Sequence, residues 1–340
     1  MQLSYKTVDL KLKHTFTIAT VSRTFTPIVL TQIAHEGSVG FGEASMPPYI
    51  GENHQTAAFF LDKAKIILSK LRYPFDIQQV MMEIDSLAEE NKAAKASIDI
   101  ALHDLKGKLD NQPVWKIFNV NPTEMPLTSF TIGIDTPSVL RQKVAESEGF
   151  SVLKIKLGSD DDKAIIRTIR EVTDKPLYVD ANQGWRDKYF ALEMTHWLKE
   201  QGVLMIEQPM LKTDFDGNAF VTEGSPLPTI ADESCQRLSD IPNLKGIFHG
   251  INIKLMKSTG LNEGFKMLQL AKSLGMKVMI GCMSETSCAV LAAAQIAPLC
   301  DYVDLDTPWL VTNNPFEKPV LLDGKIQLSN EIGLGLRLNY

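Results

Sequence analysis

The chain has 340 residues, of which 44% are hydrophobic and 22% are charged, and these ordinary values exclude a disordered, collagenous or low-complexity protein. Its 35 basic and 41 acidic side chains give a net charge of −6 without any basic stripe, so we expect no nucleic-acid partner. No apolar run reaches the roughly 20 residues that span a bilayer, and we expect neither a membrane segment nor a secretory leader. The four cysteines show no metal-type spacing and no disulfide density, which favours a reducing cytoplasm.

The first third of the chain predicts strands followed by helices. Residues 1–42 alternate and are rich in β-branched side chains, which is typical of strands. From about Asn53 to Phe118, apolar residues recur at spacings of three and four, as in helices with one buried face. Strands and helices in separate blocks indicate an α+β domain, which we place at residues 1–122.

From Thr128 onward, short β-rich runs alternate with helical stretches. Eight such runs occur, and a polar residue near the end of each recurs every 22 to 30 residues: Thr131, Lys156, Asp180, Glu207, Asp232, Lys254, Ser284 and Asp306. This period predicts an eight-stranded βα barrel over residues 123–320, whereas two separate α/β domains would interrupt it. The tail, 321–340, has no ninth helix, and we expect it to return to the first domain.

Three acidic residues, Asp180, Glu207 and Asp232, end three consecutive predicted strands. In such barrels the strand ends converge on the face that carries active sites. Three carboxylates a few ångströms apart repel one another unless a cation lies between them. Oxygen ligands without cysteine or histidine favour a hard ion, so we expect Mg²⁺, with Mn²⁺ as a substitute. A single acidic strand end would be read as a helix cap, but three in register predict a metal site.

Three lysines stand among the apolar residues of two predicted strands. Lys154 and Lys156 are two residues apart and therefore point to the same face, and Lys254 lies in the strand four places further around the ring. Burial of charge in a strand is costly without a purpose. We expect Lys156 and Lys254 to face a substrate carbon from opposite walls. The alternative is that these lysines only form salt bridges with the carboxylates.

This arrangement predicts a proton transfer. A carboxylate bound to Mg²⁺ has an acidified α-hydrogen, because the metal stabilises the enediolate that forms when the proton leaves. Burial, the ion and the second ammonium are expected to lower the pKa of the lysine base from about 10.4. Removal of the proton on one side and its return on the other would invert the carbon, a 1,1-proton transfer.

The eighth run ends in Asp304-Leu-Asp306, and both carboxylates approach the barrel mouth on a strand that supplies no metal ligand. A spare anionic pair suits an ammonium group, such as the amino terminus of a peptide. The alternative is a solvated strand end that caps the next turn.

These residues together resemble the enolase superfamily, muconate-lactonizing subgroup, over nearly the whole chain. The resemblance rests on KIK at 154–156, DANQGW at 180–185, IEQP at 206–209, ADES at 231–234 and NIKLMK at 252–257. The DLDTPWL segment at Asp304 resembles the DxD pattern of that family's dipeptide epimerases, including L-Ala-D/L-Glu epimerases.

The resemblance implies an α/β protein, a modified (β/α)7β TIM barrel with an N-terminal α+β capping domain. It also implies an Mg²⁺-dependent isomerase that epimerises the carboxy-terminal residue of a dipeptide. Ten residues receive roles by this resemblance: Asp180, Glu207 and Asp232 as metal ligands, Lys156 and Lys254 as the acid/base pair, Thr131 and Lys154 at the substrate carboxylate, Asp304 and Asp306 at its ammonium, and Arg23 at a side-chain carboxylate.

The preferred second residue of the dipeptide stays open. Arg23 matches an arginine of glutamate-specific members, although a surface arginine is the alternative. Phe25 beside it and Glu285 at the seventh strand argue against an anionic side chain. Ser258-Thr259-Gly260 stands where the family usually has a Gly-Gly pair, which we expect to alter a loop conformation and no charge.

Two other functions compete with the dipeptide epimerase. A cycloisomerase, an o-succinylbenzoate synthase or an N-acylamino acid racemase would use the same lysines on a substrate without a free ammonium, leaving Asp304 and Asp306 idle. A peptide-binding protein that has lost turnover would keep the site and exchange no hydrogen. The sequence leaves a homo-oligomer open.

Overall fold

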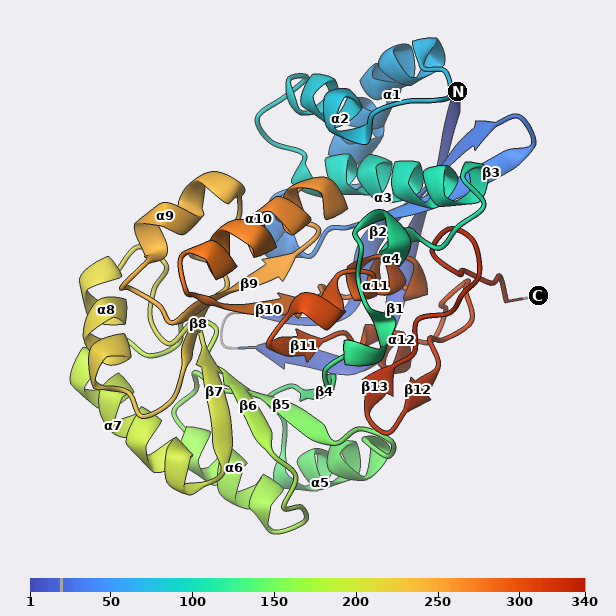
Figure 1. Cartoon of the computed structure of the whole chain (residues 1–340). Coiled ribbons are helices and arrows are strands. Elements are labelled where there is room, and N and C mark those ends of the chain that lie inside the picture. The colour runs from blue at the N-terminus through green and yellow to red at the C-terminus, as the bar shows by residue number, and fades with distance from the viewer. Residues whose placement is uncertain (19–20, 340) are drawn as a thin grey trace.

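The computed structural model describes residues 1–18 and 21–339. Within them, an antiparallel sheet of three strands is followed by helices, a parallel sheet of eight strands and a short hairpin near the C-terminus. Figure 1 shows α1, α2 and α3 stacked over one side of the barrel that the parallel strands form. No helix of the described part combines the length and the apolar character needed to cross a bilayer.

In the N-terminal part of the chain the strands precede the helices, as the sequence predicts. The elements are β1 (Gln2–Ile18), β2 (Val21–His35), β3 (Ser38–Ser45), α1 (His54–Lys70), α2 (Ile77–Asp85), α3 (Lys92–Leu109) and α4 (Val114–Ile117). Helix α3 lies so close to β3 that a Cβ on Gly42 would stand 1.9 Å from the carbonyl oxygen of Ser97. The glycines of the β3 sequence are therefore required by this close approach of two backbones.

All eight strands that the sequence predicts are confirmed, and all pair in parallel in chain order. They are β4 (Ser129–Ile132), β5 (Val152–Lys156), β6 (Leu177–Asp180), β7 (Val203–Glu207), β8 (Thr229–Ala231), β9 (Gly250–Lys254), β10 (Lys277–Gly281) and β11 (Tyr302–Asp304). A parallel bridge between Thr128 and Val303 joins the first strand to the last.

Helices follow the strands, as the alternating pattern predicts. They are α5 (Pro137–Glu146), α6 (Asp162–Arg170), α7 (Lys188–Glu200), α8 (Phe215–Gly224), α9 (Ile241–Leu244), α10 (Leu261–Ser273), α11 (Ser287–Ala294) and α12 (Thr307–Leu310). Within the described residues, the last strand is followed by the four-residue helix α12 and then by the C-terminal segment, in agreement with a (β/α)7β barrel.

The barrel interior is built in layers, because alternate residues of a strand point inward. One layer is an apolar cluster formed by Val152, Tyr178, Met205, Ile230 and Met279. The residue two positions further along each strand forms the next layer toward the carboxyl ends, and there the sequence has Lys154, Asp180, Glu207, Asp232 and Gly281. The apolar layer fills the interior of the barrel. The charged layer lies above it, toward the carboxyl ends of the strands, and forms the bottom of the site.

Buried acids fasten the capping domain to the barrel. Glu43 on β3 accepts hydrogen bonds from the backbone N–H groups of Thr286 (2.8 Å) and Ala289 (3.2 Å), at the N-terminus of α11. Asp99 on α3 accepts from the N–H of Leu261 (2.5 Å), at the N-terminus of α10. Unpaired N–H groups at helix N-termini favour carboxylates, so each contact satisfies a barrel helix with an acid from the other domain.

The C-terminal segment contacts α3. It contains the hairpin β12 (Leu321–Leu322) and β13 (Lys325–Ile326), and beyond it the N–H of Leu334 donates to Asp104 Oδ1 of α3 at 2.8 Å. The N–H of Gly333 donates to the carbonyl of Gln112 at 3.0 Å. These contacts agree with the expected return of the tail, while the domain boundaries themselves stay a prediction.

Thr259 adopts the backbone conformation that a glycine would favour. Its φ is 59°, in the left-handed region, and that of Gly260 is 116°. A β-branched residue is strained there, so the sequence departure at 258–260 keeps a glycine-like loop at an energetic cost. We expect Thr259→Gly to raise the free energy of unfolding by about 1 kcal/mol, measured by urea denaturation. An equal or lower stability would contradict this reading of the loop.

Candidate active site

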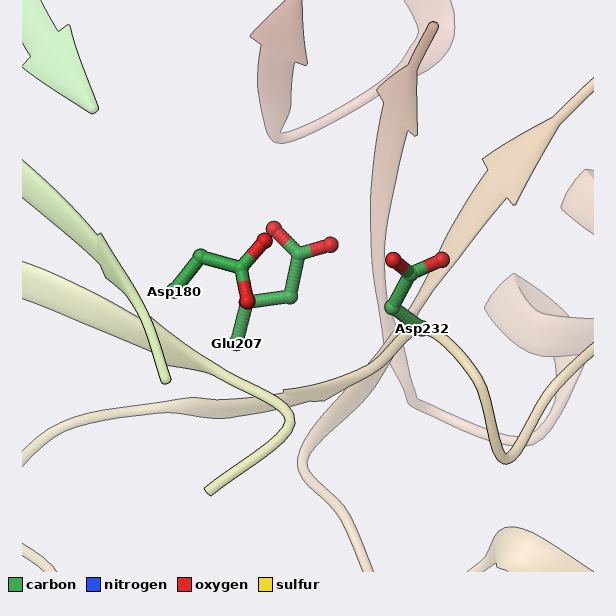
Figure 2. Close-up of side chains that lie close together, drawn as sticks. All are labelled: Asp180, Glu207 and Asp232. Atoms are coloured by element: carbon green, nitrogen blue, oxygen red, sulfur yellow. The ribbon is translucent and has the colours of Figure 1, made fainter. Parts of the chain in front are cut away.

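The three predicted carboxylates meet at the carboxyl ends of adjacent strands. One oxygen from each of Asp180, Glu207 and Asp232 lies within 4.8 Å of the others, and all three side chains are buried. Figure 2 shows the three carboxyl groups gathered over the strand ends. The register explains the meeting, because Asp180 pairs directly with Glu207 across β6 and β7. We call these three side chains the acidic triad.

The DANQGW motif shapes the loop that leaves Asp180. A Cβ on Gly184 would stand 2.2 Å from the Cα of Gly158, so glycine is needed for the two loops to touch. The indole N–H of Trp185 donates to Asp162 Oδ2 at 2.8 Å, and the same carboxylate accepts from the N–H of Gly158. The loops after β5 and β6 are therefore held together, and the second of them begins at Asp180.

The electrostatics of the triad favour a cation. Burial raises the pKa of Glu207, and the neighbouring Asp180 carboxylate raises it further, so that this pKa reaches about 6. Burial also raises the pKa of Asp180, but the ammonium groups of Lys156 and Lys154 outweigh it and hold that pKa below its usual range. Oxygen Oε2 of Glu207 is buried and contacts the ammonium of Lys154 at 2.6 Å. A donor set of three buried carboxylates, without cysteine or histidine, fits a hard divalent ion.

Two buried lysines flank the triad, each held by one close contact. Lys156 Nζ lies 2.6 Å from Asp180 Oδ2, and Lys254 Nζ lies 2.6 Å from Asp232 Oδ2. Their strands are separated by three others in the eight-stranded sheet, and both side chains line the same pocket. Burial lowers the pKa of Lys254, but the carboxylates of Asp232 and Glu207 outweigh it and raise that pKa well above its usual value.

Lys154 is bound far more tightly than its neighbour on the same strand. Its ammonium lies 2.6 Å from Glu207, 2.7 Å from Asp304 and 3.5 Å from Asp180, and the side chain is buried. Burial opposes its charge, yet Asp304, Glu207 and Asp180 raise the pKa of Lys154 well above the usual value. Its expected role at a substrate carboxylate stays a prediction.

The acid pair at the end of β11 is divided between two environments. Asp304 accepts hydrogen bonds from Ser129 Oγ (2.7 Å), Thr131 Oγ1 (3.2 Å) and Lys154 Nζ (2.7 Å). Asp306 accepts from the backbone N–H of Thr131, and burial together with Asp304 raises its pKa to about 7. Thr131 is thus bound to the acid pair, whereas its predicted place at the substrate carboxylate stays a prediction.

Arg23 lies inside the pocket and not on the outer surface. Its guanidinium donates to Ser284 Oγ at 2.9 Å and to Thr26 Oγ1 at 3.1 Å. The rings of Phe16 and Tyr49 lie 5.1 and 5.9 Å from it. Its Nη1 is buried without a hydrogen-bond partner among the described residues. A buried guanidinium N–H without an acceptor is suited to an anionic group of a ligand.

The expectation that Phe25 and Glu285 oppose an anionic side chain does not fit the structure. Phe25 is 48% exposed, and among the described residues that line the pocket neither Phe25 nor Glu285 occurs. Glu285 accepts a hydrogen bond from the N–H of Met283 at 2.9 Å, and burial raises its pKa to about 8. At neutral pH this carboxyl group is largely protonated and therefore does not repel an anion.

Three residues of the site escaped the sequence reasoning. Lys257 Nζ contacts Asp232 Oδ1 at 2.5 Å, and Asn252 Nδ2 donates to Glu207 Oε1 at 2.7 Å. Gln208 binds the loop after β8 through its side chain. Lys257 has the only sequence signal of the three, since it places a second charge three residues after Lys254 within an apolar run.

The chain matches two known families along most of its length. Residues 3–118 match the mandelate racemase / muconate lactonizing enzyme N-terminal domain. Residues 139–340 match the enolase C-terminal domain-like family. Together these matches cover the capping sheet with its helices and most of the barrel.

Curated relatives are similar over nearly the whole chain. An L-Ala-D/L-Glu epimerase of Bacteroides thetaiotaomicron is 52% identical over 337 residues, which cover 99% of this chain and 88% of the relative. An L-Ala-D/L-amino acid epimerase of Pedosphaera parvula is 38% identical and covers 93% of this chain and 92% of its own.

Two solved structures have closely similar folds. A dipeptide epimerase of Enterococcus faecalis, complexed with Mg and L-Leu-L-Tyr, is 32% identical with a TM-score of 0.90, covering 99% of both chains. A substrate-liganded L-Ala-D/L-Glu epimerase of Bacillus subtilis is 26% identical with a TM-score of 0.92, covering 100% of this chain and 99% of the other.

Proposed function

The chain belongs to the enolase superfamily and is an isomerase of the epimerase type, and from this premise we propose that it is an Mg²⁺-dependent dipeptide epimerase. We infer that it inverts the α-carbon of the carboxy-terminal residue of an L-Ala-L-Xaa dipeptide by 1,1-proton transfer. Its relatives and solved neighbours are named for the epimerisation of dipeptides, which supports the reaction class.

The observation that carries the proposal is the pair of lysines on separate walls of one pocket. Lys156 and Lys254 come from β5 and β9, and each ammonium has a single contact shorter than 3 Å, to a carboxylate of the triad. An amine held by one close contact can leave it to reach a substrate, unlike Lys154 with its three partners. One lysine would take the α-proton and the other would return a proton on the opposite face.

The acidic triad would hold the cation, with Asp180, Glu207 and Asp232 as ligands and Mn²⁺ as a substitute ion. When bound, Mg²⁺ supplies positive charge that stabilises the enediolate and offsets the carboxylates that raise the pKa of Lys254. The apolar layer below the triad and the capping loop with Tyr49 would exclude water from the reacting carbon.

The lining of the pocket supports a dipeptide substrate. Asp304 and Asp306 would bind the free ammonium, and Thr131 and Lys154, which contact this acid pair, would help to hold the substrate carboxylate. The unsatisfied Nη1 of Arg23, which lines the same pocket, would meet the side-chain carboxylate of a second residue such as glutamate. The 52% identical relative is named for Glu, which agrees with this assignment.

The test is exchange of the α-hydrogen in D₂O. Incubation of L-Ala-L-Glu with Mg²⁺ and the purified protein should place deuterium on the glutamate α-carbon and yield both configurations, measured by NMR and chiral chromatography. A panel with aliphatic, aromatic and basic second residues should be slower than Glu. Deuterium uptake in no member of the panel, with folded and metal-loaded protein, would sink the proposal.

The acid pair gives a pH dependence that separates dipeptides from substrates without an ammonium. Asp306 must be ionised to bind an ammonium, and burial with Asp304 raises its pKa to about 7. We therefore expect kcat/KM to fall about tenfold per pH unit below pH 7 and to level off above it.

Neutral variants of the pair complete this measurement. Asp306→Asn should raise the KM for L-Ala-L-Glu by about 10²-fold, because a charged hydrogen bond to the ammonium is lost. Its turnover of an N-acylated amino acid should change far less. Unchanged dipeptide kinetics in Asp306→Asn would favour a cycloisomerase, an o-succinylbenzoate synthase or an N-acylamino acid racemase.

A further inference from the structure

Gln208 is a buried amide directly after the triad residue Glu207. Its Oε1 accepts hydrogen bonds from the backbone N–H groups of Asp232 (3.0 Å) and Ser234 (3.1 Å). Its Nε2 donates to the carbonyl of Met210 at 3.1 Å and to Ser234 Oγ at 2.9 Å. Both the oxygen and the nitrogen of the amide therefore form hydrogen bonds. The oxygen binds the backbone of Asp232, a second triad residue.

The backbone at Gln208 connects to the loop that follows the third triad residue, Asp180. Its carbonyl accepts from the N–H of Gln183 at 2.9 Å, in the loop that leaves Asp180, and the N–H of Ala181 donates to the carbonyl of Glu207 at 3.1 Å. Gln208 therefore joins the ends of β6, β7 and β8, the three strands that carry the triad.

Backbone strain is concentrated at the same place. Gln208 has a φ of 38°, and Asn182 and Gln183 have φ values of 45° and 65°, all in the left-handed region without being glycine. Such conformations persist only where surrounding contacts fix them, and they cluster at functional sites. The side-chain hydrogen bonds of Gln208 are contacts of this kind.

We propose that Gln208 is a positioning residue that sets the spacing of the acidic triad for a divalent cation. The inference rests on the cation site of the proposed function. Mg²⁺ demands nearly ideal ligand geometry, so a small shift of Asp232 relative to Glu207 weakens its binding. Partners that orient metal ligands typically change metal affinity by about 10- to 100-fold when they are removed.

Gln208 suits a direct test because it is uncharged. Replacement of a lysine or an acid near the triad would change the local charge as well as the geometry. Gln208→Met removes both amide ends with little change of length and no change of charge. Gln208→Glu keeps the oxygen that accepts from Asp232 and Ser234, and it serves as the conservative variant.

The experiment measures Mn²⁺ affinity by electron paramagnetic resonance and Mg²⁺ affinity by calorimetry. We expect Gln208→Met to raise the Kd for either ion by about 10- to 100-fold. Gln208→Glu should remain within about threefold of the parent protein or bind more tightly. At saturating metal, the rates of α-hydrogen exchange with L-Ala-L-Glu and with L-Ala-D-Glu should fall by the same factor in Gln208→Met. The reason is that neither of the two lysines is altered in this variant.

Gln183→Met is the matched control, since the hydrogen bond of its side chain goes to the N–H of Lys212 (3.0 Å) and not to the triad. Circular dichroism and Tm report folding, and if Gln208→Met does not fold, Gln208→Asn, whose shorter amide withdraws from the same partners, carries the test with the same expected rise in Kd. Parental affinity in Gln208→Met, or equal weakening in Gln208→Glu and Gln183→Met, would overturn the inference. Failure of the parent protein to bind Mn²⁺ would instead contradict the proposed cation site.

Discussion

Replacement of either Lys156 or Lys254 by methionine is expected to lower the epimerisation rate by about 10³-fold, within the range that general acid–base groups contribute. The two variants should differ in a revealing way. If the lysines act on opposite faces, each variant keeps one working base and therefore still exchanges the α-hydrogen of one configuration in D₂O. Lys156→Met and Lys254→Met should retain exchange with opposite configurations, measured by NMR on L-Ala-L-Glu and L-Ala-D-Glu.

Lys199→Met is the control for this experiment, because Lys199 is an exposed lysine in the last turn of α7 and is not among the described residues that line the pocket. It should epimerise at the parental rate. Retention of exchange with the same configuration in both active-site variants would mean that the two amines act from one side, and inversion would lose its physical basis.

Glu207→Gln is expected to lower kcat/KM by about 10³-fold, which corresponds to about 4 kcal/mol of transition-state stabilisation. The variant keeps the shape of the side chain and removes one of the three charges that would hold the cation. Its affinity for Mg²⁺ and Mn²⁺, measured by calorimetry, should fall together with its activity. In parallel, a chelator should abolish the activity of the parent protein and added Mg²⁺ should restore it.

Glu193→Gln provides the comparison, since Glu193 pairs with Lys163 on the exposed side of α7. That variant should bind the ion and turn over substrate as the parent does. Activity of the parent protein that survives complete chelation would contradict a metal-dependent mechanism, whatever the result for Glu207→Gln.

The barrel and its charged layer could be predicted from the sequence because both follow from periodicity. Polar residues at strand ends recur with the length of one strand, one helix and two loops, and the period of two along a strand places Lys154 and Lys156 on one face. Asp180, Glu207 and Asp232 were therefore expected to converge, and their oxygens do lie together.

Contacts between distant segments could not be predicted in this way. Nothing in the sequence near Glu43 or Asp99 indicates that each caps a barrel helix in the other domain. The same limit explains the error over Glu285, whose position in the chain suggested a side-chain pocket. Its burial and its bond to Met283 depend on how the loop after β10 packs against the capping sheet.

Gln208 and Asn252 were missed for a related reason. A neutral amide within an apolar strand end gives no charge pattern, and its role emerges only when its partners on neighbouring strands are known. The left-handed backbone conformation of Thr259 could not be predicted either. The sequence indicates such a conformation only where glycine or asparagine occupies the position.

The acids that reach from the capping domain to the helix ends of the barrel limit how this enzyme can be recombined with its relatives. The donors are backbone N–H groups at helix N-termini, which a homologous barrel also presents, so the requirement falls on the capping domain. A chimaera whose capping domain lacked an acid at position 43 or 99 would leave the N-terminus of α11 or α10 without its acceptor. Exchange of whole domains is therefore restricted to homologues that keep both acids, whereas substitutions within β2, which carries Arg23, leave these contacts intact.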